Sequence, residues 1–264
     1  MQGILMQRHR AMTTTTPSTT TPSTSTPSTS TPASSPETSS ETSADTPYPS
    51  GSDCRSAFQA AYENRYTWSP DFGGYQGRCI WERDGQRLEG RFQVGADLKA
   101  VVEGVDDEAV HKEIAGQLWE VAIHRVRRSF ADTHGQNTFT AGDSDDTGLE
   151  VIVGGKNSGD RYRIKHDVVT MVHRHIHGTV VTIYTTSVTQ TGTGYLSRTY
   201  TSQYSDPATG ALRGGVNCFT DTFVALPGGG PWVLAERTVE STPETGGSPQ
   251  QRTAFRFEEL RPLG

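Results

Sequence analysis

From Gly135 to the C-terminus, polar and apolar side chains alternate with a period of two residues, segment after segment. Successive side chains of a β-strand point to opposite faces of a sheet, so this alternation predicts strands with one buried face and one solvated face. Few other chain conformations are compatible with such a pattern. The predicted strands are residues 161–166, 168–177, 179–189, 195–204, 212–223, 232–241 and 253–260.

Short turn sequences separate these segments and favour hairpins. Thr191 to Gly194, Asp206 to Gly210 and Pro227 to Pro231 are rich in residues that adopt the backbone angles of tight turns. Consecutive strands joined by such turns form an antiparallel meander. The C-terminal half of the chain is therefore predicted to be one long antiparallel sheet.

Two segments before Gly135 have helical spacing of their apolar residues instead. They are predicted to be helices from Cys54 to Arg65 and from Asp107 to about Phe130. Asp106 is placed to cap the second helix at its N-terminus.

Three further strands are predicted between the two helices. Arg78 to Arg83 and Arg87 to Val94 flank a tight-turn signal, and Leu98 to Glu103 follows them. The predicted fold class is therefore α+β: a long, curled antiparallel β-meander, like half a barrel, with two main helices packed on one face.

Residues 1–49 have a different composition, with repeated Thr, Ser and Pro and few apolar side chains. Such a segment cannot bury enough surface to offset the entropy of ordering, so it is predicted to be a disordered tail. Met12 opens the low-complexity run and is an alternative start to Met1. Residues 50–264 are predicted to form a single domain, since their number suits one antiparallel core.

Charge and cysteine content exclude several classes of protein. The net charge is −6, of which the tail contributes −1 (two arginines, three acids) and the remainder −5, which argues against a nucleic-acid partner. No run of apolar residues is long enough for a transmembrane segment. The three cysteines lack the spacing of a zinc or disulfide framework. A cytoplasmic protein is the resulting expectation.

A block of twelve residues, AFQAAYENRYTW from Ala57 to Trp68, is followed by shorter motifs in a recognisable order. They include VDDE from Val105, HR at His124, HG at His134 and TGTGYLS from Thr191. On these motifs, over about residues 55–260, the sequence resembles an uncharacterised family catalogued as domain of unknown function 3386.

The resemblance implies a source among cyanobacteria or plastid-bearing eukaryotes, and therefore the cytoplasm or, in a eukaryote, the plastid stroma. It implies no activity, because none is established for the family. The Thr/Ser/Pro tail and the histidines described next depart from the family pattern.

Three histidines, His173, His175 and His177, alternate along one predicted strand, so their imidazoles are expected on one face. Two of them with a third ligand from a neighbouring strand could hold zinc or another divalent metal. The alternative is a solvated sheet face with polar side chains.

Aromatic residues gather near the end of the first predicted helix: Tyr62, Tyr66 and Trp68, with Arg65 among them. Such a cluster can line a ligand site, or it can simply fasten a helix to a sheet. The resemblance adds two polar residues to this candidate binding set, His134 and Asn137.

No catalytic set and no cofactor motif is predicted. Ser129, Asp132 and His134 lie within six positions of one another, whereas nucleophilic triads are assembled from distant elements. The leading hypothesis is a non-enzymatic binding or accessory protein that holds a small apolar ligand or a protein partner between sheet and helices. The alternatives are a metal-dependent or hydrolytic enzyme built on the three histidines, and a structural partner that pairs through a sheet edge.

Overall fold

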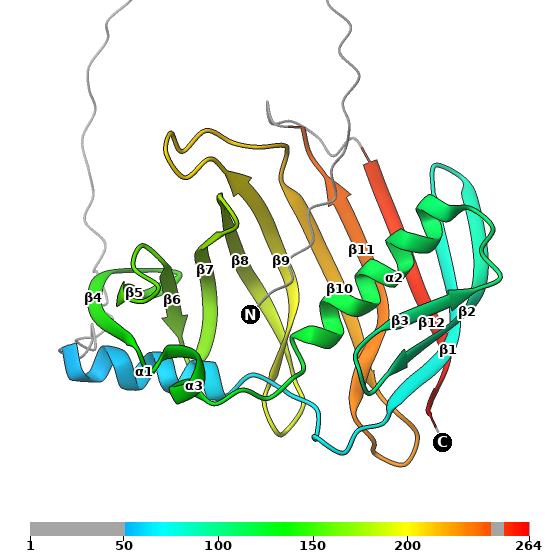
Figure 1. The fold of residues 1–264 in the computed structure, drawn as a ribbon, viewed down its shortest axis with the longest axis horizontal. Coiled ribbons are helices and arrows are strands. Elements are labelled where there is room, and N and C mark those ends of the chain that lie inside the picture. The colour runs from blue at the N-terminus through cyan, green and yellow to red at the C-terminus, as the bar shows by residue number, and fades with distance from the viewer. Residues whose placement is uncertain (1–50, 244–250, 264) are drawn as a thin grey trace, which may run out of the picture. The chain divides into compact units, whose positions relative to one another are not determined.

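The computed structural model describes residues 51–243 and 251–263, so the predicted tail lies outside the described residues. In this part of the chain, three helices accompany one sheet of twelve strands (Figure 1). The helices are α1 (Gly51–Glu63), α2 (Glu108–Ile123) and α3 (Phe130–His134). The strands are β1 (Gly74–Arg83), β2 (Gln86–Gly95), β3 (Ala100–Glu103), β4 (Asn137–Asp145), β5 (Gly148–Gly155), β6 (Arg161–Lys165), β7 (Val168–Ile176), β8 (Thr179–Gln190), β9 (Tyr195–Ser205), β10 (Asn217–Ala225), β11 (Trp232–Ser241) and β12 (Gln251–Pro262).

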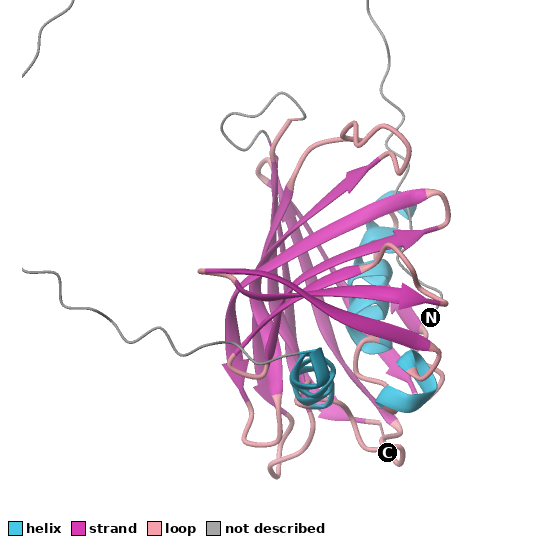
Figure 2. Cartoon of the chain, turned by 90° about the vertical axis from the view of Figure 1, so that its left-hand side faces the viewer, coloured by secondary structure: helices cyan, strands magenta, loops and turns pink. Residues whose placement is uncertain are grey.

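The strand order is β3-β2-β1-β12-β11-β10-β9-β8-β7-β6-β5-β4, and each neighbouring pair is antiparallel. Strands β4 to β12 follow the chain order, which confirms the predicted meander. The segment with α2 and α3 carries the chain from β3, at one edge, to β4, at the other. The sheet curls strongly, with the helices on one side of it (Figure 2), so the predicted α+β class is confirmed.

Two predicted boundaries of the second helix are wrong. The helix begins one residue later, because the Asp107 side chain caps it by accepting from the backbone N–H groups of Ala109 and Val110. It ends at Ile123 and not near Phe130, because Ser129 starts a new helix, α3, by accepting from the N–H of Asp132. Strands β4 and β5 lie within the segment after Gly135 that was predicted to alternate with period two, but no bounds were predicted for them.

The buried side chains form two separate cores on the inner, helix-bearing face of the sheet. The α2 core joins α2 to β1, β2, β3, β9, β10, β11 and β12, and the α1 core joins α1 and α3 to β5, β6 and β7. Burying each large apolar side chain contributes about 1.5–3 kcal/mol, so each helix is held chiefly by its own core. Prominent members are Trp81, Phe92, Ile114, Leu118 and Phe255 in the α2 core, and Phe58, Tyr62, Phe130, Val151 and Tyr162 in the α1 core.

The outer face of β1, β2 and β12 carries a network of charged side chains. Arg87 pairs with Glu82 at 2.7 Å, and Arg256 pairs with the same carboxylate at 2.6 Å. Arg78 also pairs with Glu89 at 2.8 Å. Exposed pairs of this kind add little stability, but they mark this face as solvated.

None of the helices within the described ranges combines the length and apolar character that a membrane span requires. Strands β3 and β4 form the two edges of the sheet. Pairing of another chain with either edge stays a prediction.

Candidate functional site

The inner faces of β8 and β9 lie between α1 and the nearer end of α2, and α2 crosses in front of β10 (Figure 1). The backbone of α2 lies closest to β3, with β1 and β2 next, and its buried side chains also reach β10, β11 and β12, whereas α1 packs against β4 to β7. Four half-buried apolar or aromatic side chains project from this part of the inner face, and we call them the inner strip: Ile183, Tyr200, Tyr204 and Phe219.

Cross-strand pairing explains how the inner strip is assembled. Tyr200 on β9 lies opposite Phe219 on β10, and their rings stack with centroids 4.8 Å apart. Phe219 shares the inner face of β10 with the buried Phe223, because residues four apart on a strand point the same way. The strip therefore adjoins the α2 core.

A buried ion pair lies beside the inner strip. Arg237 and Asp221 are 2% and 1% exposed, and the guanidinium donates to both carboxylate oxygens, at 2.7 and 2.6 Å. Arg237 also donates to the Tyr200 hydroxyl at 2.7 Å and to Gln117 Oε1 of α2 at 2.9 Å. These bonds connect α2 with β9, β10 and β11. All three nitrogens of the Arg237 guanidinium donate in them.

Besides Arg78 Nε on the outer face, two buried side-chain groups have no hydrogen-bond partner among the described residues. Arg125 is 9% exposed, and its Nε has no hydrogen-bond acceptor among the described residues. The Tyr75 hydroxyl is likewise unpaired there, on a residue with 0% exposure. Burial raises the pKa of Tyr75, and the positive charges of Arg125 and Arg237 act in the opposite direction.

Positive charge gathers near the C-terminal end of α2. Loss of hydration inside the curled sheet lowers the pKa of His124, and the charges of Arg125 and Arg65 lower it further. The His124 side chain nevertheless keeps contact with solvent. Arg237 and Arg128 also lower the pKa of His124, so four arginines place positive charge at this end of α2.

Three of the predicted binding residues belong to the α1 core. His134 is 4% exposed, and its ring lies 5.0 Å from that of Phe58 and 5.1 Å from that of Tyr62. Asn137 Nδ2 lies 3.1 Å from His134 Nδ1, and the Tyr62 hydroxyl lies 2.8 Å from that of Thr133. Burial, followed by the charges of Arg174 and Arg65, lowers the pKa of His134 to about 4. These contacts pack α1 and α3 onto the sheet.

The other predicted binding residues fasten the segment between α1 and β1. Arg65 lies over the Tyr62 ring at 3.9 Å, and its Nε donates to the Tyr62 carbonyl oxygen. The Tyr66 hydroxyl accepts from the N–H of Trp232, and Trp68 Nε1 donates to the carbonyl oxygen of Trp232, both at 2.9 Å. The six predicted residues are thus divided between two cores, and ligand binding by them stays a prediction.

The histidine segment differs in part from the predicted strand. Strand β7 ends at Ile176, so His177 lies in the following turn, with a φ of 48°. His173 and His175 project from the outer face with ring centroids 5.8 Å apart, and His173 Nδ1 is bonded to Thr182. Within the described residues, no group of three His, Cys, Asp or Glu side chains is placed to hold a metal ion. Metal binding stays a prediction, which titration with Zn²⁺ would check.

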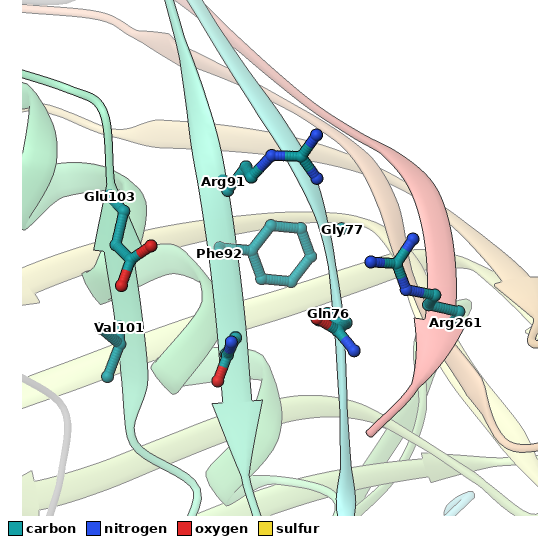
Figure 3. Close-up of a pocket in the computed structure, with 8 residues that line it drawn as sticks. Gln76, Gly77, Arg91, Phe92, Val101, Glu103 and Arg261 are labelled. Atoms are coloured by element: carbon teal, nitrogen blue, oxygen red, sulfur yellow. The ribbon is translucent and has the colours of Figure 1, made fainter. Parts of the chain in front are cut away.

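A shallow pocket lies on the outer face, over β1, β2 and β3, with Arg91 and Arg261 at its rim (Figure 3). Its volume is about 50 Å³, whereas sites for organic ligands usually measure about 300–1,000 Å³. Exposed Val101 and Glu103 border it on the edge strand β3. This pocket is too small to hold an apolar ligand.

Sequence reasoning missed the polar centre of the inner face. The available signal was Asp221, which occupies an inward position of β10 between Phe219 and Phe223. A carboxylate at a core position needs a buried partner, and Arg237 on β11 is at the matching inward position.

Comparison with known proteins gives a family but no activity. The model of a family described as "Protein of unknown function (DUF3386)" matches residues 50–263. No curated protein matches. Among solved structures, the chain is similar to the crystal structure of a DUF1329 family protein from Desulfovibrio piger, at 10% identity and a TM-score of 0.26, over 79% of this chain and 92% of that one.

Proposed function

Because the chain belongs to the DUF3386 family, whose function is unknown, we propose a function from its own inner face. The protein is a non-enzymatic binding protein that holds a long apolar ligand against the inner strip, between α1 and α2. The observation that carries this proposal is the set of aromatic and aliphatic side chains on the inner face that remain partly exposed in the folded chain.

The chemistry of the inner strip supports an elongated apolar ligand. The Tyr200 and Phe219 rings stack on each other, Tyr204 adds a third partly exposed ring, and Ile183 adds an aliphatic surface. Aromatic side chains bury about 150–250 Å² each when fully covered, and covering apolar surface contributes about 25 cal/mol per Å². A ligand that covers the remaining exposed part of these four side chains would gain several kcal/mol before the cost of immobilisation.

The polar groups beside the strip support binding over catalysis. Arg237 and Asp221 are bonded to each other and to Tyr200, which gives them a structural task. His134, the imidazole of the Ser129, Asp132 and His134 set, is enclosed by aromatic rings of the α1 core.

The test is binding of the neutral fluorescent probe N-phenyl-1-naphthylamine to the full-length chain, together with native mass spectrometry after gentle purification. We expect saturable binding to the unmodified protein. Phe219→Ser should weaken it at least fivefold, because the variant loses one of the stacked rings. Tyr184→Ser changes an aromatic residue that is 45% exposed on the outer face of β8, and it should leave binding unchanged.

Absence of probe binding, together with absence of any copurified molecule, would contradict the proposal. Equal affinities of the two variants would contradict the assignment to the inner face. Circular dichroism of both variants checks that they are folded.

We also propose a cytoplasmic location, or the plastid stroma in a eukaryote. The support is that Cys54, Cys79 and Cys218 are all free thiols, as is usual in a reducing compartment. Fractionation of the source cells with an antibody would check it.

A further inference from the structure

Arg125 is a buried cation without a counter-ion. It follows the C-cap of α2, and its backbone oxygen is held by the N–H of Trp68 at 2.8 Å. The guanidinium lies over the ring of Phe223, 5.4 Å from the centroid. Among the described residues, no carboxylate forms an ion pair with it and its Nε has no acceptor.

Arg237, on β11, has the partners that a buried arginine needs. It has a carboxylate bonded to two of its nitrogens, a hydroxyl and a side-chain amide. Burying an arginine without such partners is costly, because its hydration is lost and not replaced. Burial lowers the pKa of Arg125 to about 10, although the negative charge of Asp221 acts to raise it. The group is therefore charged at neutral pH and lacks an anion.

The surroundings of Arg125 favour an anion of low charge. Further positive charge lies close by, because Arg65 and Arg128 also lower the pKa of the neighbouring His124. The Tyr75 hydroxyl is a second buried donor without a partner among the described residues, and the charge of Arg125 acts on the pKa of Tyr75. Asp221 also acts on Arg125, and its negative charge would repel a dianion more than a monoanion.

The anion site adjoins the inner strip. Phe223, under the Arg125 guanidinium, and Phe219, in the strip, lie on one face of β10. Four residues of strand place them about 13 Å apart, a length that a long hydrocarbon chain spans.

We propose that Arg125 anchors the head group of the ligand, which is a long-chain fatty acid or a similar amphiphile with a single carboxylate. The guanidinium donates to the carboxylate, the Tyr75 hydroxyl supplies a further hydrogen bond, and the hydrocarbon chain lies on the inner strip. A planar guanidinium matches a carboxylate well, since two parallel hydrogen bonds can form. This inference rests on the proposed function and names its ligand class.

The experiment compares three compounds by displacement of N-phenyl-1-naphthylamine from the full-length chain. Oleate has both carboxylate and chain, oleyl alcohol has the chain alone, and acetate has the carboxylate alone. We expect oleate to bind at least tenfold more tightly than oleyl alcohol, and acetate not to displace the probe. With Arg125→Gln, oleate should fall to the affinity of oleyl alcohol.

Further variants separate an anchor from a structural role. Arg125→Lys keeps the charge and should retain part of the preference for oleate. Arg127→Gln removes an exposed arginine two residues away and should leave all affinities unchanged. If Arg125→Gln does not fold, Tyr75→Phe replaces it: we expect a folded protein with oleate affinity reduced severalfold and unchanged affinity for oleyl alcohol.

The outcomes distinguish this inference from the proposed function. If oleate and oleyl alcohol bind equally well to the unmodified protein, the apolar site stands and the carboxylate anchor is overturned. If acetate competes as well as oleate, the site binds free carboxylates and the amphiphile is overturned. If neither long-chain compound displaces the probe, the proposed function fails as well.

Discussion

His134 is used for packing in this protein, and its protonation state follows from its neighbours. Asn137 Oδ1 accepts from the N–H of Asn157, so the amide nitrogen of Asn137 faces His134 Nδ1 and donates to it. A protonated imidazole would place two donors against each other at this contact and a charge among aromatic rings. Both effects favour the neutral ring.

We therefore expect stability to fall in mild acid. The pKa of His134 is lowered from 6.5 to about 4 in the folded protein, so between these values the unfolded chain binds a proton that the folded one does not. The contribution is complete above pH 6.5 and is lost as the pH falls towards 4, by about 1.4 kcal/mol per pH unit.

Urea unfolding at pH 7.5 and at pH 5 would measure this effect. His134→Gln should lose about 2 kcal/mol less than the unmodified protein between these pH values. His177→Asn, at an exposed turn position with positive φ that Asn tolerates, is the control and should keep the full loss. An equal loss in His134→Gln would contradict the role given to His134.

Removal of the hydroxyl from two buried tyrosines, Tyr75 and Tyr195, is expected to change the free energy of unfolding in opposite directions. The hydroxyl of Tyr75 has no partner among the described residues, so Tyr75→Phe should stabilise the ligand-free protein by about 1 kcal/mol. The hydroxyl of Tyr195 accepts from the N–H of Val169 and donates to the Ala61 carbonyl oxygen, so Tyr195→Phe should destabilise it by about 1 kcal/mol or more. Midpoints of urea unfolding would compare them, and a stability loss in Tyr75→Phe would show that its hydroxyl is satisfied.

Among the elements, α2 has the clearest local determinant. Two adjacent aspartates precede it, and the cap is Asp107, whose Oδ1 accepts from Ala109 N at 2.9 Å and from Val110 N at 3.0 Å. The sequence alone could not choose between them, because Asp106 and Asp107 are equally good capping residues. The choice depends on where the chain leaves β3.

Substitution of the two aspartates would test this assignment. Asp107→Ala should lower the free energy of unfolding by about 1 kcal/mol, because two backbone N–H groups lose their acceptor. Asp106→Ala should change it by less than about 0.5 kcal/mol, as is usual for an exposed position without a special contact. Chemical denaturation would measure both, and equal losses would contradict the assignment of the cap.

The element-scale predictions succeeded where patterns were regular and failed where they were interrupted. Strands β6 to β12 have clear alternation or turn signals, and their order in the sheet was predicted. Strand β4 was missed because small and acidic residues from Ala141 to Asp145 weaken its alternation. The interruption of the long helix was missed because Val126 and Phe130 continue the helical spacing, although Phe130 packs in the other core.

At the scale of the whole molecule, β12 connects strands from the beginning of the described chain with the meander that follows α3. It pairs with β1 on one side and β11 on the other, with Trp81 opposite Phe255. Phe255 and Phe257 also belong to the α2 core. Without β12, the β1–β3 unit would have no partner in the meander, and two sheet edges would be exposed.

Truncation after residue 243 should therefore abolish cooperative thermal unfolding and cause aggregation. Removal of residues 1–49, which precede the family match and the first described helix, should leave the midpoint of unfolding unchanged. Circular dichroism and size-exclusion chromatography would measure both variants. A cooperative, monomeric truncation lacking β12 would contradict the role assigned to this strand.

The sequence by itself determined the strand-rich class, the order of the C-terminal meander and the presence of two main helices. These features depend on alternation and turn chemistry, which act between residues a few positions apart. Only the tertiary structure decided that β12 pairs with β1, where Arg83 donates to Thr253 across 170 positions. It also decided that Asp221 pairs with Arg237, and that no acid among the described residues forms an ion pair with Arg125. Contacts of this kind arise where distant segments meet in the sheet, and no local pattern encodes them.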